Sequence, residues 1–174
     1  MPRAWCLTPV AGGDILHLAL YHPAIPQNTG NISRTTVGFG AALHLIHPMS
    51  FAIDDTKVKR AGLDHWDHVR LTEHANDDAF LDWLDRHLDA HPGARAWLVT
   101  KFGSTRFDRI RYGADDVLIL GNENTGLPQH LHDRFPETRV SIPMPGAASS
   151  NLRSYNLANA AAILLATATC QHLP

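Results

Sequence analysis

The chain lacks the features that mark secreted and membrane-bound proteins. Only two of its 174 residues are cysteines, Cys6 and Cys170, and they form no CxxC pair, so neither a disulfide framework nor a zinc knuckle is predicted. The longest apolar stretch, residues 160–168, is too short to cross a bilayer of about 30 Å. Because the N-terminus also lacks the apolar core of a signal peptide, we expect a cytoplasmic protein that binds no membrane.

Excess charge is also missing. The formal net charge is −2, which argues against a globally basic nucleic-acid binder but leaves room for a local basic patch. Twelve histidines raise the question of a metal site, and His87 and His91 lie four residues apart. No HExxH motif or suitably placed carboxylate accompanies them. We therefore expect no metal and interpret the histidines as solvated or helix-capping side chains.

The order of the predicted elements indicates a single α/β domain. Apolar runs predict strands at 15–20, 42–46, 68–72, 95–100, 116–120 and 139–142. Helical periodicity predicts helices from about 32, from 76, around 129–135 and over 157–168, and a short basic helix capped by Asp54. Such alternation predicts a mostly parallel sheet flanked by helices. Residues 1–14 are interpreted as an N-terminal extension and 15–174 as the domain.

Three polar loops follow predicted strands, where open α/β sheets bind ligands. In residues 21–34, Asn31 and Arg34 share a helix face and suit a phosphate clamp. In residues 121–128, Gly121 allows close approach of the backbone to a ligand. In residues 143–156, small residues beside Ile142 and Met144 suit a flat adenine. Taken alone, the first loop fits a surface arginine equally well, and the second fits an ordinary strand-to-helix turn equally well.

Taken together, the three loops resemble the motifs of the SPOUT (SpoU/TrmH-type) RNA 2′-O-ribose methyltransferases. The first, PxNxGNxxR, corresponds to residues 26–34; the second, GxExxGLP, to 121–128. The third corresponds to IPM at 142–144 followed by RSYNLANA at 153–160. The resemblance covers about residues 15–168. It is strongest to the minimal branch that methylates the wobble ribose (cytidine or uridine) of tRNA.

The resemblance implies a C-terminal deep trefoil knot, a homodimer, tRNA as the substrate and S-adenosylmethionine as the cofactor, with no metal. It also implies roles for individual residues. Arg34, Ser154 and Asn156 match the catalytic positions. The implied cofactor-binding residues are Leu98, Gly121, Glu123, Ile142, Met144, Ser154 and Tyr155. The predicted RNA-binding residues are Asn28, Asn31, Arg34, Lys57, Lys59 and Arg60.

Several features leave alternatives open. Residues 145–152 make the third loop about four residues longer than is usual in that branch, and Asn122 and Asn124 replace smaller or hydroxyl-bearing residues. A second basic cluster, Arg106, Arg109 and Arg111, fits either an RNA contact or a solvated face. Ribosomal RNA or another tRNA position is an alternative substrate. A catalytically silent binding protein on the same fold, or an unrelated nucleotide-binding protein, is an alternative function.

Overall fold

A seven-stranded sheet forms the centre of the protein. The computed structural model describes residues 15–52, 65–150 and 152–172. The sheet has the order β3-β2-β1-β6-β4-β7-β5, and all its pairings are parallel. The strands are β1 (His17–Tyr21), β2 (Ala42–Ile46), β3 (Arg70–His74), β4 (Ala96–Val99), β5 (Thr105–Arg106), β6 (Val117–Leu120) and β7 (Arg139–Ser141).

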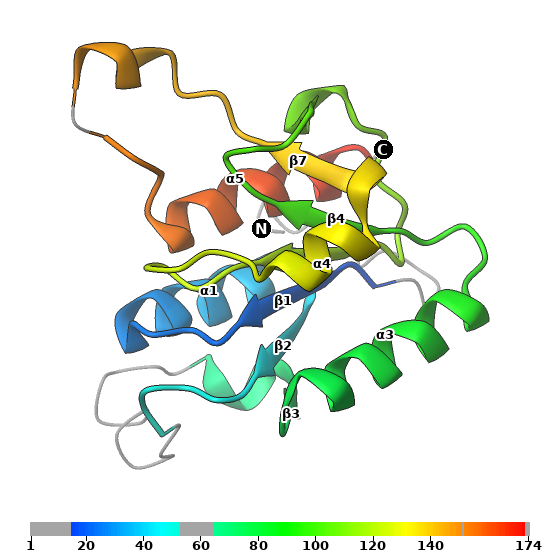
Figure 1. Ribbon diagram of the computed structural model, residues 1–174. Coiled ribbons are helices and arrows are strands. Elements are labelled where there is room, and N and C mark those ends of the chain that lie inside the picture. The colour runs from blue at the N-terminus through cyan, green and yellow to red at the C-terminus, as the bar shows by residue number, and fades with distance from the viewer. Residues whose placement is uncertain (1–14, 53–64, 151, 173–174) are drawn as a thin grey trace, which may run out of the picture.

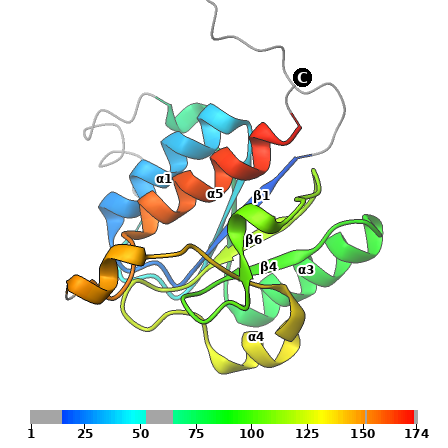
Figure 2. The same cartoon turned by 90° about the horizontal axis from the view of Figure 1, so that it is seen from above.

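Helices cover both faces of the sheet (Figure 1). On one face, α1 (Pro26–Phe39) packs against α5 (Leu157–Cys170), as Figure 2 shows. On the other lie α3 (Asp77–Ala90) and α4 (Gln129–Arg134). A parallel sheet needs both faces covered, which is why its strands are nearly continuous apolar runs. In the described part of the chain, no helix is long and apolar enough to span a membrane.

The predicted α/β architecture is confirmed, with two differences. Helix α1 begins at Pro26 rather than near residue 32, because proline suits the first turn of a helix, whose N–H groups have no intrahelical partner. Strand β5 was not predicted, because two residues carry no periodicity. The basic helix predicted after Asp54 and the N-terminal extension lie outside the described residues. The trefoil knot stays a prediction.

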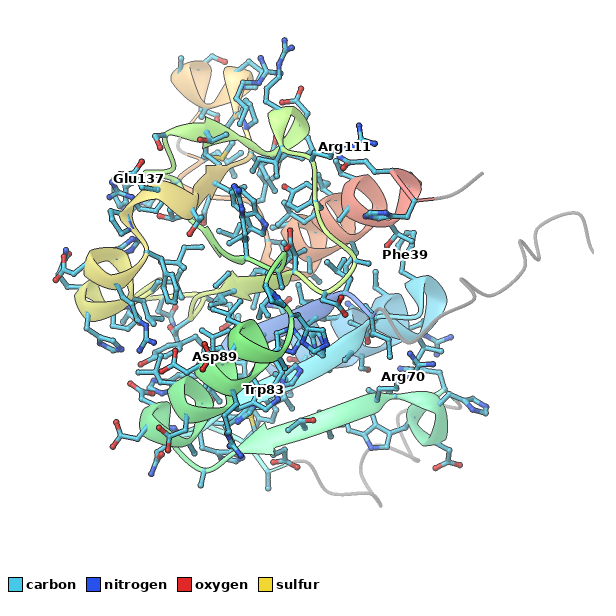
Figure 3. The ribbon with its side chains drawn as sticks, turned by 90° about the vertical axis from the view of Figure 1, so that its right-hand side faces the viewer. Phe39, Arg70, Trp83, Asp89, Arg111 and Glu137 are labelled. Carbon is cyan, nitrogen blue, oxygen red and sulfur yellow. The ribbon has the colours of Figure 1, made fainter. Side chains whose placement is uncertain are left out.

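Three histidines form a chain across the sheet, contrary to the predicted solvated or capping roles. His17 Nδ1 lies 2.9 Å from His44 Nε2, and His44 Nδ1 lies 2.9 Å from His74 Nε2. The Trp83 ring of α3 covers the middle ring at 4.0 Å between centroids and is labelled in Figure 3. His44 is 2 % exposed. The three rings, which we call the histidine chain, are part of the core.

The histidine chain makes the fold sensitive to acid. Burial, and to a smaller extent the neighbouring histidines, lower the pKa of His44 to about 2 and that of His17 to about 4. Above pH 6.5, both rings are neutral in the folded and unfolded states alike. Below it the unfolded chain binds protons that the folded chain does not. We therefore expect the free energy of unfolding to fall by about 1.4 kcal/mol per pH unit for each ring between pH 6.5 and about 4.

Urea unfolding from pH 7.5 to 4.5 measures this slope. In His44→Gln the side chain keeps a donor and an acceptor but does not titrate, so the slope should decrease by about one proton. His68→Gln, which changes an exposed histidine, is the matched control and should leave the slope unchanged. Equal slopes for wild type and His44→Gln would contradict the role of the histidine chain.

Candidate functional site

A cleft of about 690 Å³ opens at the carboxyl ends of the central strands. Four loops border it: the one after β1, the one after β4, the one after β6 and the long segment between β7 and α5. Segments far apart in sequence therefore meet here, on the left of Figure 1. The lining residues include Ile25, Asn28, Val99, Thr100, Lys101, Phe102, Gly121, Glu123, Leu127, Ile142, Met144, Arg153, Ser154, Tyr155, Asn156 and Leu157.

The loop after β6 is a tight turn closed by its own backbone. Asn122 and Gly126 exchange backbone hydrogen bonds of 3.1 and 2.8 Å, and Gly126 has φ +74°, a conformation that favours glycine. Asn122 Oδ1 also accepts the N–H groups of Asn124 and Thr125. The asparagine that departs from the resembled motif thus stabilises the turn.

Glu123 at the tip of this turn joins it to the loop after β1. Its carboxylate accepts hydrogen bonds from Ala24 N at 2.9 Å, Ile25 N at 3.2 Å and Asn28 Nδ2 at 3.0 Å. The first residue flanking α1, Ile25, supplies no side-chain cap. A carboxylate from a distant loop therefore lies at the N-terminal end of the helix, where negative charge is favourable.

The same network continues to α5. Asn156 Nδ2 donates to Asn28 Oδ1 at 2.9 Å, while Asn156 Oδ1 accepts the N–H groups of Ala158 and Asn159. Asn156 is therefore the N-cap of α5 and also a partner of α1. Asn28 is 5 % exposed and lies between Glu123 and Asn156. One hydrogen-bond chain, which we call the Glu123 network, thus connects all three sequence motifs.

Removing the charge of Glu123 should weaken this network. In Glu123→Gln an amide N–H₂ group replaces one acceptor oxygen and faces donors. We expect the free energy of unfolding to fall by about 1–3 kcal/mol and ligand affinity at the cleft to fall with it. Urea denaturation measures the change. Glu137→Gln is the control, since Glu137 is exposed and outside the network, and it should match wild type. Equal stability of the two variants would contradict the role of Glu123.

The cleft brings together most of the predicted cofactor-binding residues. Gly121, Glu123, Ile142, Met144, Ser154 and Tyr155 all line it. Leu98 does not: its side chain is fully buried in the core on the α3 and α4 side of the sheet, and the next residues, Val99 and Thr100, line the cleft instead. Successive side chains of a strand point to opposite faces, and the sequence alone did not show which face met the cleft.

The predicted RNA-binding and catalytic residues are only partly brought together. Ser154 and Asn156 line the cleft, whereas Arg34 is exposed on α1 and is not among the lining residues. Asn31 is also exposed. Asn28 lines the cleft but is buried, and its oxygen and one amide hydrogen already bond within the protein, so its contact with RNA stays a prediction. Lys57, Lys59 and Arg60 lie outside the described residues.

The loop after β4 supplies cleft residues that were not predicted. Thr100, Lys101 and Phe102 line the cleft, and Phe102 is 72 % exposed with the Lys101 ammonium 5.0 Å from its ring centroid. The rule that ligands bind at the carboxyl ends of strands would have found them. An exposed aromatic ring beside a cation suits the face of an unpaired base.

Comparisons with known proteins agree on one family. Residues 15–166 match the model of the SpoU rRNA Methylase family. The tRNA (cytidine(34)-2′-O)-methyltransferase of Methylovorus glucosotrophus is 40% identical over 156 residues, which are 89% of this chain and 94% of that protein. The protein of the same name from Yersinia pestis is 37% identical over 152 residues, covering 87% of this chain and 90% of its own.

A solved structure gives the same result. It is described as giving structural insights into the 2-OH methylation of C/U34 on tRNA, and it is 40% identical to this chain. The match has a TM-score of 0.79 and covers 92% of this chain and 98% of the other. The similarity therefore extends over nearly the whole domain and over all four loops of the cleft.

Proposed function

Because the chain belongs to the SpoU rRNA methylase family, we propose that it transfers the methyl group of S-adenosylmethionine to the ribose 2′-hydroxyl of the tRNA wobble nucleotide, a cytidine or modified uridine. The Glu123 network is the observation that carries this proposal, since it fixes the three motifs around one cleft. The named relatives act on cytidine 34 of tRNA, and they match this chain from end to end of the domain.

The cleft suits the cofactor in size and chemistry. Small-molecule sites are usually clefts of about 300–1,000 Å³ with apolar walls and a few fixed polar groups, and this cleft falls within that range. Val99, Ile142 and Leu157 provide apolar wall for an adenine ring, and Ser154 and Asn156 add polar side chains to the lining. S-adenosylmethionine supplies a methyl group on a positively charged sulfur, which is a good leaving group.

The protein must align the ribose oxygen with that methyl group, so that the O–CH3 bond forms as the CH3–S bond breaks, and the 2′-hydroxyl proton must leave to solvent water. Arg34 stays protonated, as guanidinium groups do in proteins, so it acts electrostatically by holding a phosphate or stabilising the developing alkoxide. Ser154 and Asn156 orient the ribose. Asn156 is held in place by its hydrogen bonds as the N-cap of α5 and by its bond to Asn28.

The substrate and the assembly follow from the same proposal. The enzyme works in the cytoplasm on tRNA. It acts as a homodimer, because one chain of 174 residues with a net charge of −2 offers little RNA-binding surface alone. The exposed Phe102 and the adjacent Lys101 contact an unpaired base near the target ribose. The family description names rRNA, so ribosomal RNA is the second substrate to assay.

Methyl transfer to RNA from cells that lack the protein tests the proposal. Purified protein, whose mass in solution is measured by light scattering, is incubated with labelled S-adenosylmethionine and either tRNA or ribosomal RNA. Mapping of 2′-O-methyl groups should find a new methyl at the wobble ribose of tRNA. New methylation of ribosomal RNA alone would move the proposal to that substrate. Cofactor binding without transfer to either RNA would identify a silent binding protein.

A further inference from the structure

Three arginines surround a second cavity at the opposite end of the sheet from the cleft. The cavity has a volume of about 670 Å³, and its lining includes Arg95, Arg109, Arg111, Thr105, Trp97 and Glu137. Figure 3 labels Arg111 and Glu137, two of these lining residues. The three arginine side chains are exposed.

The arginines are available to a ligand. Within residues 15–52, 65–150 and 152–172, Arg109 and Arg111 make no ion pair and no hydrogen bond from their side chains, and Arg95 makes only a contact with the Trp97 ring, at 5.9 Å from its centroid. Arg106 differs, because it donates two hydrogen bonds to Asp108 at 3.0 and 2.8 Å. The arginines available around the cavity therefore differ from the basic cluster grouped in the sequence, because they include Arg95 and exclude Arg106.

Hydrogen bonds hold the backbone around these arginines in place. Asp116 is 1 % exposed and accepts hydrogen bonds from Arg95 N, Trp97 Nε1 and Gly113 N at 2.6–2.8 Å. Its buried charge is thus satisfied by the wall of the cavity and is not exposed to a ligand. On the other side, Gln171, the C-cap of α5, accepts a hydrogen bond from Tyr112 N and donates one to Ile110 O, each at 3.0 Å. A backbone held in this way limits where the three guanidinium groups can lie, which lowers the entropy cost of binding an anion.

One short segment connects this cavity to the cleft. Lys101 and Phe102 line the cleft, and Thr105, only three residues further on, lines the cavity. Thr105 belongs to β5, the edge strand of the sheet, so no further strand covers this path. The four residues of β4 between the two ends span about 13 Å. Because successive phosphates of an RNA strand are only a few ångströms apart, a few nucleotides are enough to reach from the cavity to the cleft.

We propose that the cavity formed by Arg95, Arg109 and Arg111 binds backbone phosphates of the same RNA whose ribose enters the cleft. Arginine suits this ligand, because its planar guanidinium pairs two of its N–H groups with two phosphate oxygens. The inference rests on the proposed function for the identity of the RNA. Glu137, at the border of the cavity, opposes the phosphates by charge repulsion.

Equilibrium binding of a fluorescently labelled tRNA transcript over a series of salt concentrations tests the proposal without requiring methyl transfer. For the double variant Arg109→Gln/Arg111→Gln we expect at least a tenfold weaker Kd at low salt. The slope of log Kd against log salt should decrease by about 1.5, the loss of two phosphate contacts. Glu137→Gln should bind more tightly than wild type. Circular dichroism should show that all variants are folded.

Arg70→Gln is the matched control. Arg70 is exposed at the amino end of β3, labelled in Figure 3, on the opposite edge of the sheet. Among the described residues, its side chain donates a hydrogen bond to Gly40 O at 3.3 Å. It should bind tRNA like wild type. A double variant with the Kd and salt slope of Arg70→Gln would overturn the proposal. A second outcome would also overturn it: wild type binds AMP in calorimetry, and the double variant loses AMP binding but keeps its tRNA affinity. The cavity would then hold a free nucleotide.

Kinetics separate this inference from the proposed function. If wild type methylates tRNA, the double variant should show a raised KM for tRNA with kcat nearly unchanged. Methylation by the double variant with an unchanged KM would refute the cavity's role alone. If wild type methylates neither RNA while the salt slope still changes as expected, the proposed function fails and the RNA-binding role of the cavity stands.

Discussion

Gly121→Ala is expected to abolish binding of S-adenosylmethionine. A Cβ at this position would lie 2.3 Å from Gly126 C and 2.5 Å from Leu127 N, and these are backbone atoms that cannot rotate away. The turn after β6 would have to open, which would displace Glu123 from Asn28 and separate the loops that border the cleft. The absent side chain thus makes room for the protein's own turn, whereas the sequence had suggested room for a ligand.

Calorimetric titration with S-adenosylmethionine measures this effect, and we expect a loss of affinity of at least a hundredfold. Thermal unfolding followed by circular dichroism shows whether the variant is folded at the titration temperature. Gly38→Ala is the control: a Cβ there meets no atom within 4 Å, and alanine in place of glycine within a helix stabilises by up to about 1 kcal/mol. A folded Gly121→Ala protein with wild-type affinity would contradict the packing argument.

Arg34→Ala should lower kcat for methyl transfer by about a hundredfold or more, the usual cost of removing a group that stabilises charge in a transition state. Its cofactor affinity should not change, because Arg34 is exposed on α1 and does not line the cleft. The two effects together would assign Arg34 to the RNA. Steady-state kinetics with tRNA and calorimetry with S-adenosylmethionine measure them separately.

Arg34→Lys distinguishes charge from shape. Lysine keeps the charge but cannot form the paired hydrogen bonds of a guanidinium. Recovery of most of the rate would mean that positive charge is sufficient, whereas a rate as low as that of Arg34→Ala would mean that the guanidinium geometry is required. A kcat/KM within threefold of wild type for Arg34→Ala would exclude a catalytic role.

The histidine chain shows how far a local pattern can be misinterpreted. His17, His44 and His74 are spaced along the sequence like ordinary surface residues. Only the parallel register of β1, β2 and β3 places nitrogen atoms of adjacent rings 2.9 Å apart. Trp83 arrives from a separate helix. Depressed pKa values follow from that burial, so neither the acid sensitivity nor its direction was available from the sequence.

The arginines around the second cavity give the same lesson. Sequence proximity grouped Arg106 with Arg109 and Arg111, yet Arg106 pairs with its near neighbour Asp108. Arg95 enters the group from the start of β4. Which cations remain available depends on the carboxylates around them, and those come from several elements.

The sequence by itself determined the alternation of strands and helices, the three motif loops and the family they resemble, because periodicity, turn residues and motif spacing are local properties of the chain. The tertiary structure decided the strand order, the position of the Glu123 carboxylate at the N-terminal end of α1, the bridging position of Asn28 and the burial of Leu98. Each of these depends on contacts between residues up to 128 positions apart, such as Asn28 with Asn156. Such contacts form only when the sheet places the carboxyl ends of its strands side by side.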